Sequence, residues 1–125
     1  VVPGNVLWSM DNLGFVLNYS TPSQVSLSDD VLDFFRAGRT FGVEFIMEEY
    51  NHSQQLFIRK YSTDGPHDGN TLPSTSGNVI DETMTCYEFV LIDEDVEAIK
   101  DQAGVSFFGG GITITKIYIK APATQ

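Results

Sequence analysis

Aromatic and polar side chains alternate in residues 55–61, and their types suit contact with a sugar. A strand here with Leu56 and Ile58 facing a core would expose the intervening side chains on its other face. These side chains are Gln55, Phe57, Arg59 and Tyr61. Aromatic rings stack on the flat C–H faces of pyranoses, and an amide or a guanidinium hydrogen-bonds to hydroxyl groups. The spacing therefore predicts a polar, aromatic surface that suits a carbohydrate.

The preceding strand-like segment, residues 41–48, is expected to lie beside this one and to enlarge the same surface. Its inward positions would be Phe41, Val43, Phe45 and Met47. Its outward positions would be Glu44, Ile46, Glu48 and Tyr50. His52 follows in a turn, and Phe108 would also face outward because it is out of phase with Val105 and Phe107. Outward aromatic residues also occur singly on ordinary sandwiches for cross-strand pairing, so this plainer interpretation stays open.

Catalytic chemistry is not expected. A glycosidase needs two carboxylates at a fixed separation in a cleft, and neighbouring acids such as Glu48 and Glu49 do not define that geometry. The sequence has no Gly-x-Ser-x-Gly, His-Glu-x-x-His or phosphate-binding loop motif. Its one cysteine, Cys86, lies in a strand-like run and is expected to be a packed or half-buried thiol. We therefore predict that the chain is not an enzyme.

No cofactor is expected, although one loop offers the hard oxygen ligands that calcium prefers. Asp64, Asp68 and Asn70 lie close together in that loop. Their spacing differs from that of the helix-flanked calcium loop, so calcium stays a secondary possibility. One Cys and two His are too few for a structural zinc site.

The charge and length of the chain limit its partners and its organisation. Its 125 residues include 7 Lys and Arg against 17 Asp and Glu, which gives a net charge of −10. Nucleic acid and anionic membrane surfaces would repel such a chain, whereas a neutral glycan is indifferent to its charge. The length fits one domain, expected over residues 1–120, with residues 121–125 as the start of a linker.

Hydrophobic alternation with a period of two dominates the sequence and predicts an all-β fold. The expected strands cover residues 6–8, 15–19, 24–27, 41–48, 55–61, 87–91, 105–108 and 112–120. Short helical turns are expected over residues 28–38 and 93–100, and a long loop over residues 62–78. In the last strand the inward set shifts by one position after Ile114, which predicts a bulge near Thr115. These elements predict a β-sandwich of two antiparallel sheets with two short helical turns.

The order of these segments resembles that of β-sandwich carbohydrate-binding modules associated with bacterial glycoside hydrolases and surface glycan-binding proteins. The resemblance lies in an apolar-Trp start, a short strand and an Ala-Gly-charged step, followed by a closing signature in the second half. These motifs are residues 6–8, 24–27, 35–41, 87–91, 95–100, 105–109 and 112–117. They cover most of residues 5–120 and imply a jelly-roll β-sandwich that binds polysaccharide.

The resemblance also implies which side chains touch the ligand. Contacts in such modules come from the sheet face and loops around the two central strands, and the positions of Trp8 and Phe108 contribute in addition. Relatives usually carry a polar residue where this chain has Phe108, and often Trp where it has Phe57 and Tyr61. The complete set of candidate ligand-binding residues is Trp8, Glu48, Tyr50, His52, Gln55, Phe57, Arg59, Tyr61 and Phe108.

The expected function is non-catalytic binding of a plant polysaccharide, a β-linked glycan such as xylan or β-glucan. The chain would be an extracellular or cell-surface module whose partners are a polysaccharide or oligosaccharide and a parent catalytic domain in the same chain. Two alternatives stay open. One is a structural or protein-interaction sandwich whose exposed aromatic residues pack on a neighbouring domain. The other is a small jelly-roll glycanase that uses Glu44 or Glu48.

Overall fold

The computed structural model describes residues 4–47, 54–61, 71–75, 78–80 and 83–122. Within these residues the chain forms nine strands and two helices. The strands are β1 (Val6–Met10), β2 (Phe15–Val16), β3 (Ser23–Ser26), β4 (Thr40–Met47), β5 (Gln55–Lys60), β6 (Asn78–Val79), β7 (Cys86–Val90), β8 (Gly104–Gly110) and β9 (Ile112–Lys120). The helices are α1 (Asp29–Leu32) and α2 (Asp93–Gln102). Neither described helix has the length and apolar character needed to cross a membrane.

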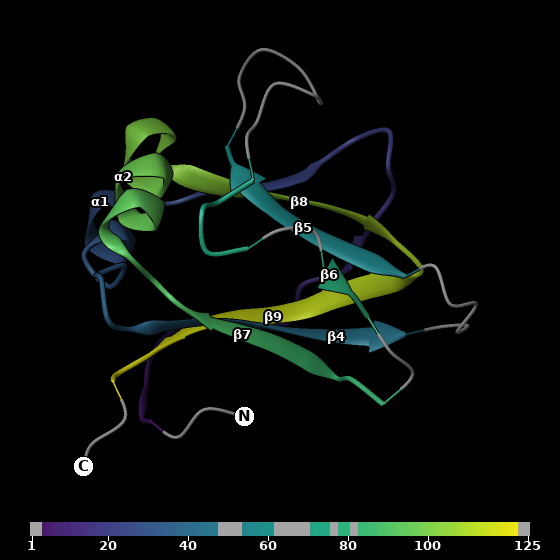
Figure 1. Ribbon diagram of the computed structural model, residues 1–125, viewed down its shortest axis with the longest axis horizontal. Helices are drawn as coiled ribbons and strands as arrows, with labels where there is room; N and C mark the ends of the chain where they lie inside the picture. Colours follow the sequence, from purple (N-terminus) through teal and green to yellow (C-terminus); the bar gives the residue numbers. More distant parts are fainter. Residues whose placement is uncertain (1–3, 48–53, 62–70, 76–77, 81–82, 123–125) are drawn as a thin grey trace.

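The strands form two antiparallel sheets that face each other. One sheet has the order β1-β9-β4-β7, with β2 also paired to β9, and the other has the order β3-β8-β5-β6. Figure 1 shows the two sheets as layers, with α1 and α2 both at the same end of the sandwich. The predicted all-β sandwich of two antiparallel sheets with two short helical segments is therefore confirmed.

The core lies between the sheets and uses the side chains whose period-two positions predicted it. Fully or nearly buried examples are Phe41, Val43, Phe45, Leu56, Ile58, Phe89, Leu91, Val105, Phe107, Ile112, Ile114, Ile117 and Ile119. Aromatic packing joins the turn after α1 to the five-stranded sheet, where Phe35 meets Phe41 of β4 edge-on with ring centroids 5.4 Å apart. Phe41 in turn stacks on Phe89 at 5.5 Å. Such pairs add to the stability gained from burial of their apolar area.

One extra residue in β9 sets which of its side chains face the core. Glu44 of β4 pairs with Lys116, but the next residue of β4, Phe45, pairs with Ile114. Thr115 is therefore the extra residue of a β-bulge, as predicted. Its hydroxyl donates a hydrogen bond to the Glu44 carbonyl at 3.3 Å. Because of the bulge, the isoleucines on both sides of it face the core, whereas Lys116 and alternate residues after it face outward.

The expectation that β4 and β5 lie side by side is wrong. β4 pairs with β7 along one edge and with β9 along the other, so both of its backbone edges are occupied. β5 is correspondingly enclosed by β6 and β8 in the opposite sheet. Glu44 and Ile46 thus lie on the far side of the sandwich from Phe57, and the single surface predicted from both strands does not form.

The helical segments and the long connection also differ in detail from the expectation. Ser28 caps α1 as predicted, since its hydroxyl accepts a hydrogen bond from the Val31 N–H at 3.4 Å. The helix ends at Leu32, and the chain then turns until Gly38, whose φ of 91° redirects it into β4. The two-residue strand β6 begins inside the segment predicted as loop, and so short a strand carries no periodic signal.

The first turn of α2 is fixed by a buried carboxylate that the sequence analysis did not single out. Asp95 is fully buried and accepts hydrogen bonds from the Ile92 N–H at 2.9 Å and the Ser74 N–H at 3.0 Å. The Ser74 hydroxyl donates to the same carboxylate. Asp95 therefore caps the helix and also fastens the turn at residues 72–75 to it.

Candidate functional site

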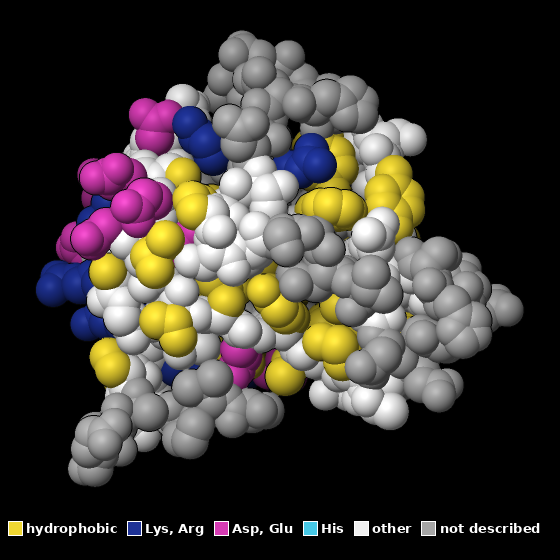
Figure 2. Space-filling model, in the orientation of Figure 1, with side chains coloured by type: hydrophobic (Ala, Val, Ile, Leu, Met, Phe, Trp, Pro, Cys, Tyr) yellow, Lys and Arg dark blue, Asp and Glu magenta, His cyan; other side chains and the backbone are white. Residues whose placement is uncertain are grey.

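The outer face of the four-stranded sheet carries five of the nine predicted ligand-binding residues, which are Gln55, Phe57, Arg59, Tyr61 and Phe108. Strand pairing places Phe57 beside Phe108 and Arg59 beside Ser106. Ser106 in turn lies beside Gln24 of β3. We call this surface the aromatic face and define it by Tyr19, Gln24, Gln55, Phe57, Arg59, Tyr61, Ser106 and Phe108. Figure 2 shows hydrophobic side chains and a cationic one gathered over the region of β5 and β8.

Arg59 and two phenylalanines form the centre of the aromatic face. The guanidinium carbon of Arg59 lies 4.6 Å from the ring centroid of Phe108 and 5.4 Å from that of Phe57. Both distances are within the range of cation–π attraction. The Arg59 Nε is buried and has no hydrogen-bond partner in the part of the chain that the structure describes. The two rings, rather than a hydrogen bond from Nε, therefore hold the guanidinium in place.

Two tyrosines lie over glycines at the ends of β8. A β-carbon built on Gly104 would be 2.7 Å from Cδ2 of Tyr61, and one built on Gly110 would be 2.6 Å from Cε2 of Tyr19. Each ring therefore occupies the space that a side chain on β8 would take. Because the rings flank Phe57 and Phe108 along the strand direction, the aromatic face is extended and has planar groups at both ends.

Amide and hydroxyl groups on this face are held by neighbours from other strands. The Tyr19 hydroxyl donates to Oε1 of Gln55 at 3.5 Å. The Ser106 hydroxyl donates to Oε1 of Gln24, which links β8 to β3. Held in this way, the amides present their polar atoms in fixed directions, which favours hydrogen bonding to a ligand's hydroxyl groups.

The expectation that the Phe108 ring is exposed for binding is wrong. Its side chain points to the outer face as predicted, but only 4% of the residue is exposed. Arg59 covers its ring, and Phe57 lies beside it on β5. Phe108 thus supports the exposed groups from below, and the ring itself is not an open stacking surface.

Trp8 lies away from the aromatic face. It belongs to β1 of the five-stranded sheet and is half-buried against the core, with its ring 5.7 Å from that of Phe35. Glu48, Tyr50 and His52 lie outside the described residues. The calcium ligands considered for the loop, Asp64, Asp68 and Asn70, lie outside them as well.

Tyr19 and Gln24 are members of the aromatic face that the sequence analysis missed. Residues 15–19 were predicted to form one strand that includes Tyr19. In the structure β2 ends at Val16, and the chain then crosses to the other sheet, where β3 lies. Tyr19 is 51% exposed, which makes it an accessible ring of this face. The two glycines that accept its ring and that of Tyr61 were the available signal, because a glycine in a strand often marks a close approach of another group.

Metal-binding and thiol chemistry find no support among these residues. No group of three or more His, Cys, Asp or Glu side chains in the described ranges is arranged to hold a metal ion. Cys86 is a free, half-buried thiol on β7, as its strand-like context predicted.

A solved structure with a similar fold was found, although comparisons of the sequence found no match. No protein-family model matches the chain, and no curated protein matches it. The chain is similar to a segment of a solved structure, SGBP-B of the Bacteroides ovatus mixed-linkage glucan utilization locus in complex with a mixed-linkage heptasaccharide. The TM-score is 0.57 at 18% sequence identity, over 92% of this chain and 30% of that one. The chain thus has the fold of a segment of a surface glycan-binding protein and corresponds to less than a third of its length.

Proposed function

We propose that this chain is a non-catalytic module that binds a β-linked plant polysaccharide, such as xylan or β-glucan, on its aromatic face. The observation that carries the proposal is the composition of this face. Phe57, Tyr61 and Tyr19 offer rings, while Arg59, Gln55 and Gln24 offer hydrogen-bonding groups beside them. Pyranose chains combine apolar C–H faces with equatorial hydroxyls, so both kinds of group find a partner.

The roles of the residues follow from their positions. The rings of Tyr19 and Tyr61 would contact sugar rings several units apart in the glycan chain, because they lie over opposite ends of β8, which at about 3.3 Å per residue are roughly 20 Å apart. The Arg59 guanidinium would donate to two neighbouring hydroxyls, since its planar fork carries several N–H groups. Affinity is expected to be modest, on the order of 10⁻⁵–10⁻³ M, because an exposed face orders a hydrated ligand with few side chains.

The similarity in fold to SGBP-B supports the proposal, because that protein was solved with a mixed-linkage heptasaccharide. We extend the same reasoning to context: the chain would act at the cell surface or outside the cell, as part of a longer protein that contains a glycoside hydrolase or further glycan-binding domains. Its role there would be to keep that protein on its substrate.

Affinity electrophoresis against a panel of soluble polysaccharides tests the proposal. Xylan, mixed-linkage β-glucan and an α-glucan should be included, and retardation is expected with a β-glycan. The double variant Phe57→Ala/Tyr61→Ala should lose this retardation. A matched control replaces two exposed apolar residues of the other sheet, Val16→Ala/Ile46→Ala, and should migrate as the unmodified chain does.

Two results would overturn the proposal. One is the absence of retardation by every β-glycan. The other is normal retardation of the Phe57→Ala/Tyr61→Ala variant, provided that its thermal unfolding shows a folded protein.

The alternative of a protein-interaction sandwich is favoured by one specific observation. Four apolar residues of the five-stranded sheet, Val6, Val16, Ile46 and Val90, are exposed by 50 to 69%. A neighbouring domain packed on this sheet would cover them. Intrinsic Tyr and Trp fluorescence separates the two functions, because a module that only packs on a neighbour should show no change when xylo- or cello-oligosaccharide is added.

A further inference from the structure

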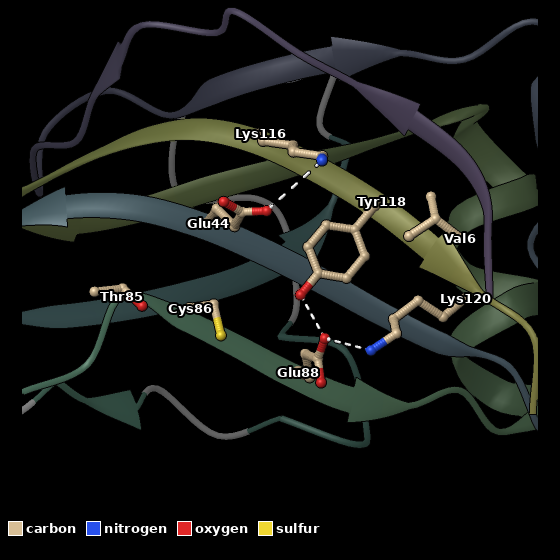
Figure 3. A pocket seen from close by; sticks show the side chains of 8 residues that line it. All are labelled: Val6, Glu44, Thr85, Cys86, Glu88, Lys116, Tyr118 and Lys120. Atoms are coloured by element: carbon tan, nitrogen blue, oxygen red, sulfur yellow. Dashed lines mark hydrogen bonds and ion pairs between the residues drawn. The ribbon is translucent and has the colours of Figure 1, made fainter. Parts of the chain in front are cut away.

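A pocket of about 330 Å³ opens on the outer face of the five-stranded sheet, on the opposite side of the sandwich from the aromatic face. One of its lining side chains, Tyr118, takes its position from Gly42 of β4. Strand pairing places Gly42 between Glu88 of β7 and Tyr118 of β9, so the middle position of this cross-strand row has no side chain. The Tyr118 ring lies across Gly42, and its hydroxyl donates a hydrogen bond to Glu88 (Figure 3).

A buried ion pair forms the base of the pocket. The Lys120 Nζ lies 3.3 Å from Oε2 of Glu88, and the two side chains are only 7% and 5% exposed. Lys120 and Glu88 come from different strands, and β4 separates them in the sheet. Burial of two charges is costly, so a pair of this kind is weak evidence for stability alone. Beneath an open pocket it offers a fixed acceptor and a fixed donor.

A second, more exposed ion pair lies at the rim of the same pocket. The Lys116 Nζ is 3.8 Å from Oε2 of Glu44, and these side chains are 33% and 47% exposed. Figure 3 shows Glu44 and Lys116 on one side of Tyr118, with Glu88 and Lys120 on the other. The pocket thus has one ammonium donor and one carboxylate acceptor at its rim and another such pair at its base, with the Tyr118 ring between the two pairs.

The charges of the lining select the class of ligand. Glu44 and Glu88 balance Lys116 and Lys120, so the lining has no net formal charge. An anion would meet the overall charge of −10, and an anion or a cation would have to compete for groups that are already paired. A hydroxyl group avoids this competition, because it donates to a carboxylate and accepts from an ammonium at the same time. These charges therefore favour a ligand that is neutral and rich in hydroxyls.

The volume of the pocket and its apolar lining further restrict the class of ligand that it can bind. Small-molecule pockets of this volume accept a ligand of one or two rings. Val6, which is 53% exposed, supplies an apolar wall against which C–H groups can pack. From these features we propose that the pocket is a second ligand site, which binds one pyranose ring of a neutral sugar. This site is independent of the aromatic face, because the two lie on opposite sheets.

Nuclear magnetic resonance of the ¹⁵N-labelled chain tests the proposal with sugars that differ only in charge. Glucose, xylose, mannose and galactose serve as neutral probes, and glucuronate and glucosamine as charged analogues. We expect saturable shifts of the backbone amides of Glu44, Glu88 and Lys116 with at least one neutral sugar. The charged analogue of the same ring should bind more weakly, by about 5-fold or more, because it must compete with the ion pairs.

Variants at the rim connect the shifts to the pocket without breaking the buried pair. Lys116→Ala removes a rim donor, and Thr85→Trp places a large side chain at an exposed lining position. Each should weaken sugar binding by about 5-fold or more, because the first variant loses a charged hydrogen-bond donor and the second fills space that the sugar would occupy. Lys100→Ala, on an exposed turn of α2, is the matched control and should bind as the unmodified chain does.

Three outcomes are distinguishable. Shifts at the pocket that Lys116→Ala weakens support the proposal. Shifts confined to β3, β5 and β8 overturn it and leave the function of the aromatic face intact. No pocket shift with any neutral sugar at about 50 mM, or equal binding of glucuronate, overturns it as well, because a site with a Kd near 10 mM would be mostly filled at that concentration.

Discussion

The ring of Tyr118 lies so close to Gly42 that a β-carbon built on the glycine would be 2.1 Å from Cζ of the tyrosine. This contact joins β9 to β4 and directs the Tyr118 hydroxyl across the sheet to Glu88. One glycine therefore determines both the packing of the ring and the hydrogen bond at its end. Because Tyr118 lines the pocket on this sheet, the missing side chain at Gly42 sets the position of that part of the pocket lining.

Replacement of Gly42 by alanine should destabilise the fold. The added β-carbon collides with a buried ring that is fixed by its hydrogen bond, so the free energy of unfolding should fall by about 1–3 kcal/mol in urea denaturation. Gly14→Ala is the matched control, because a β-carbon there meets nothing within 4 Å and should change the stability by less than about 0.5 kcal/mol. Equal stability of the two variants would contradict the packing described here.

Gly110→Ala should act on binding more than on stability. The added β-carbon meets the ring of Tyr19, which is 51% exposed, so the ring can move outward into solvent with the loss of its hydrogen bond to Gln55. Stability should change by less than about 1 kcal/mol, while retardation by β-glycan should decrease because the ring leaves its position. Electrophoresis and thermal unfolding of the same sample check both parts. Unchanged retardation would mean that Tyr19 makes no contact with the glycan.

Arg59→Lys separates shape from charge on the aromatic face. Lysine keeps the positive charge but lacks the planar guanidinium that packs on Phe57 and Phe108. Glycan binding should weaken by about 3- to 10-fold, as expected from the loss of stacking and of a two-pronged donor. Arg36→Lys, at an exposed position after α1, is the control in isothermal titration calorimetry. A variant that binds like the control would show that charge alone suffices.

Asp95→Ala should strongly destabilise the chain. It removes the acceptor for the Ile92 and Ser74 N–H groups and for the Ser74 hydroxyl, and these donors lose their buried partner. The free energy of unfolding should fall by about 2–4 kcal/mol. Asp93→Ala removes an exposed carboxylate from the same helix turn and should cost less than about 1 kcal/mol. Similar losses for the two variants would rule out the capping role of Asp95.

Tyr118 should make stability depend on pH in alkaline solution. Burial raises the pKa of Tyr118 well above its ordinary value of 10.0, and the hydrogen bond to Glu88 raises it further. Above pH 10 the unfolded chain releases this proton while the folded chain keeps it, so the folded state binds more protons and stability falls as the pH rises. Urea denaturation between pH 8 and pH 11, about one unit above the ordinary value, should show this slope.

The control for this titration is Tyr118→Phe, which should be less stable at neutral pH but should lose much of the alkaline slope. Tyr87→Phe, on β7, should keep the slope. An unchanged slope in Tyr118→Phe would assign the alkaline instability to other groups.

The period-two pattern predicted the direction of side chains well, because alternation is a local property of a strand. Thr115 illustrates this, since a break in the isoleucine pattern was enough to place the bulge. Pairing is not local, and the partner of β4 depends on which edges β7 and β9 occupy. The prediction that Glu44 and Phe57 lie on outer faces is therefore correct, whereas the prediction that they lie on the same face is wrong.

The sequence pattern also could not predict which side chains on an outer face are buried. Phe108 faces outward as predicted, yet the long side chain of Arg59 covers it, and no alternation rule reports what a neighbouring strand lays over a residue. Gly42 was counted only as a step in the alternation of β4. Its importance depends on Tyr118, 76 residues later in the chain, so the pocket could not be predicted from either residue alone.

The bulge at Thr115 shifts the alternation of inward and outward side chains in β9 by one residue. Before it, even-numbered positions such as Ile112 and Ile114 face the core; after it, even-numbered positions such as Lys116 face outward. If the strand kept Thr115 but had no bulge, strict alternation would turn Lys116, Tyr118 and Lys120 toward the core in exchange for isoleucines, whereas deletion of Thr115 would leave the same side chains facing inward. In this strand the local departure from regular pairing, rather than the identity of Thr115, therefore keeps the charged side chains out of the core.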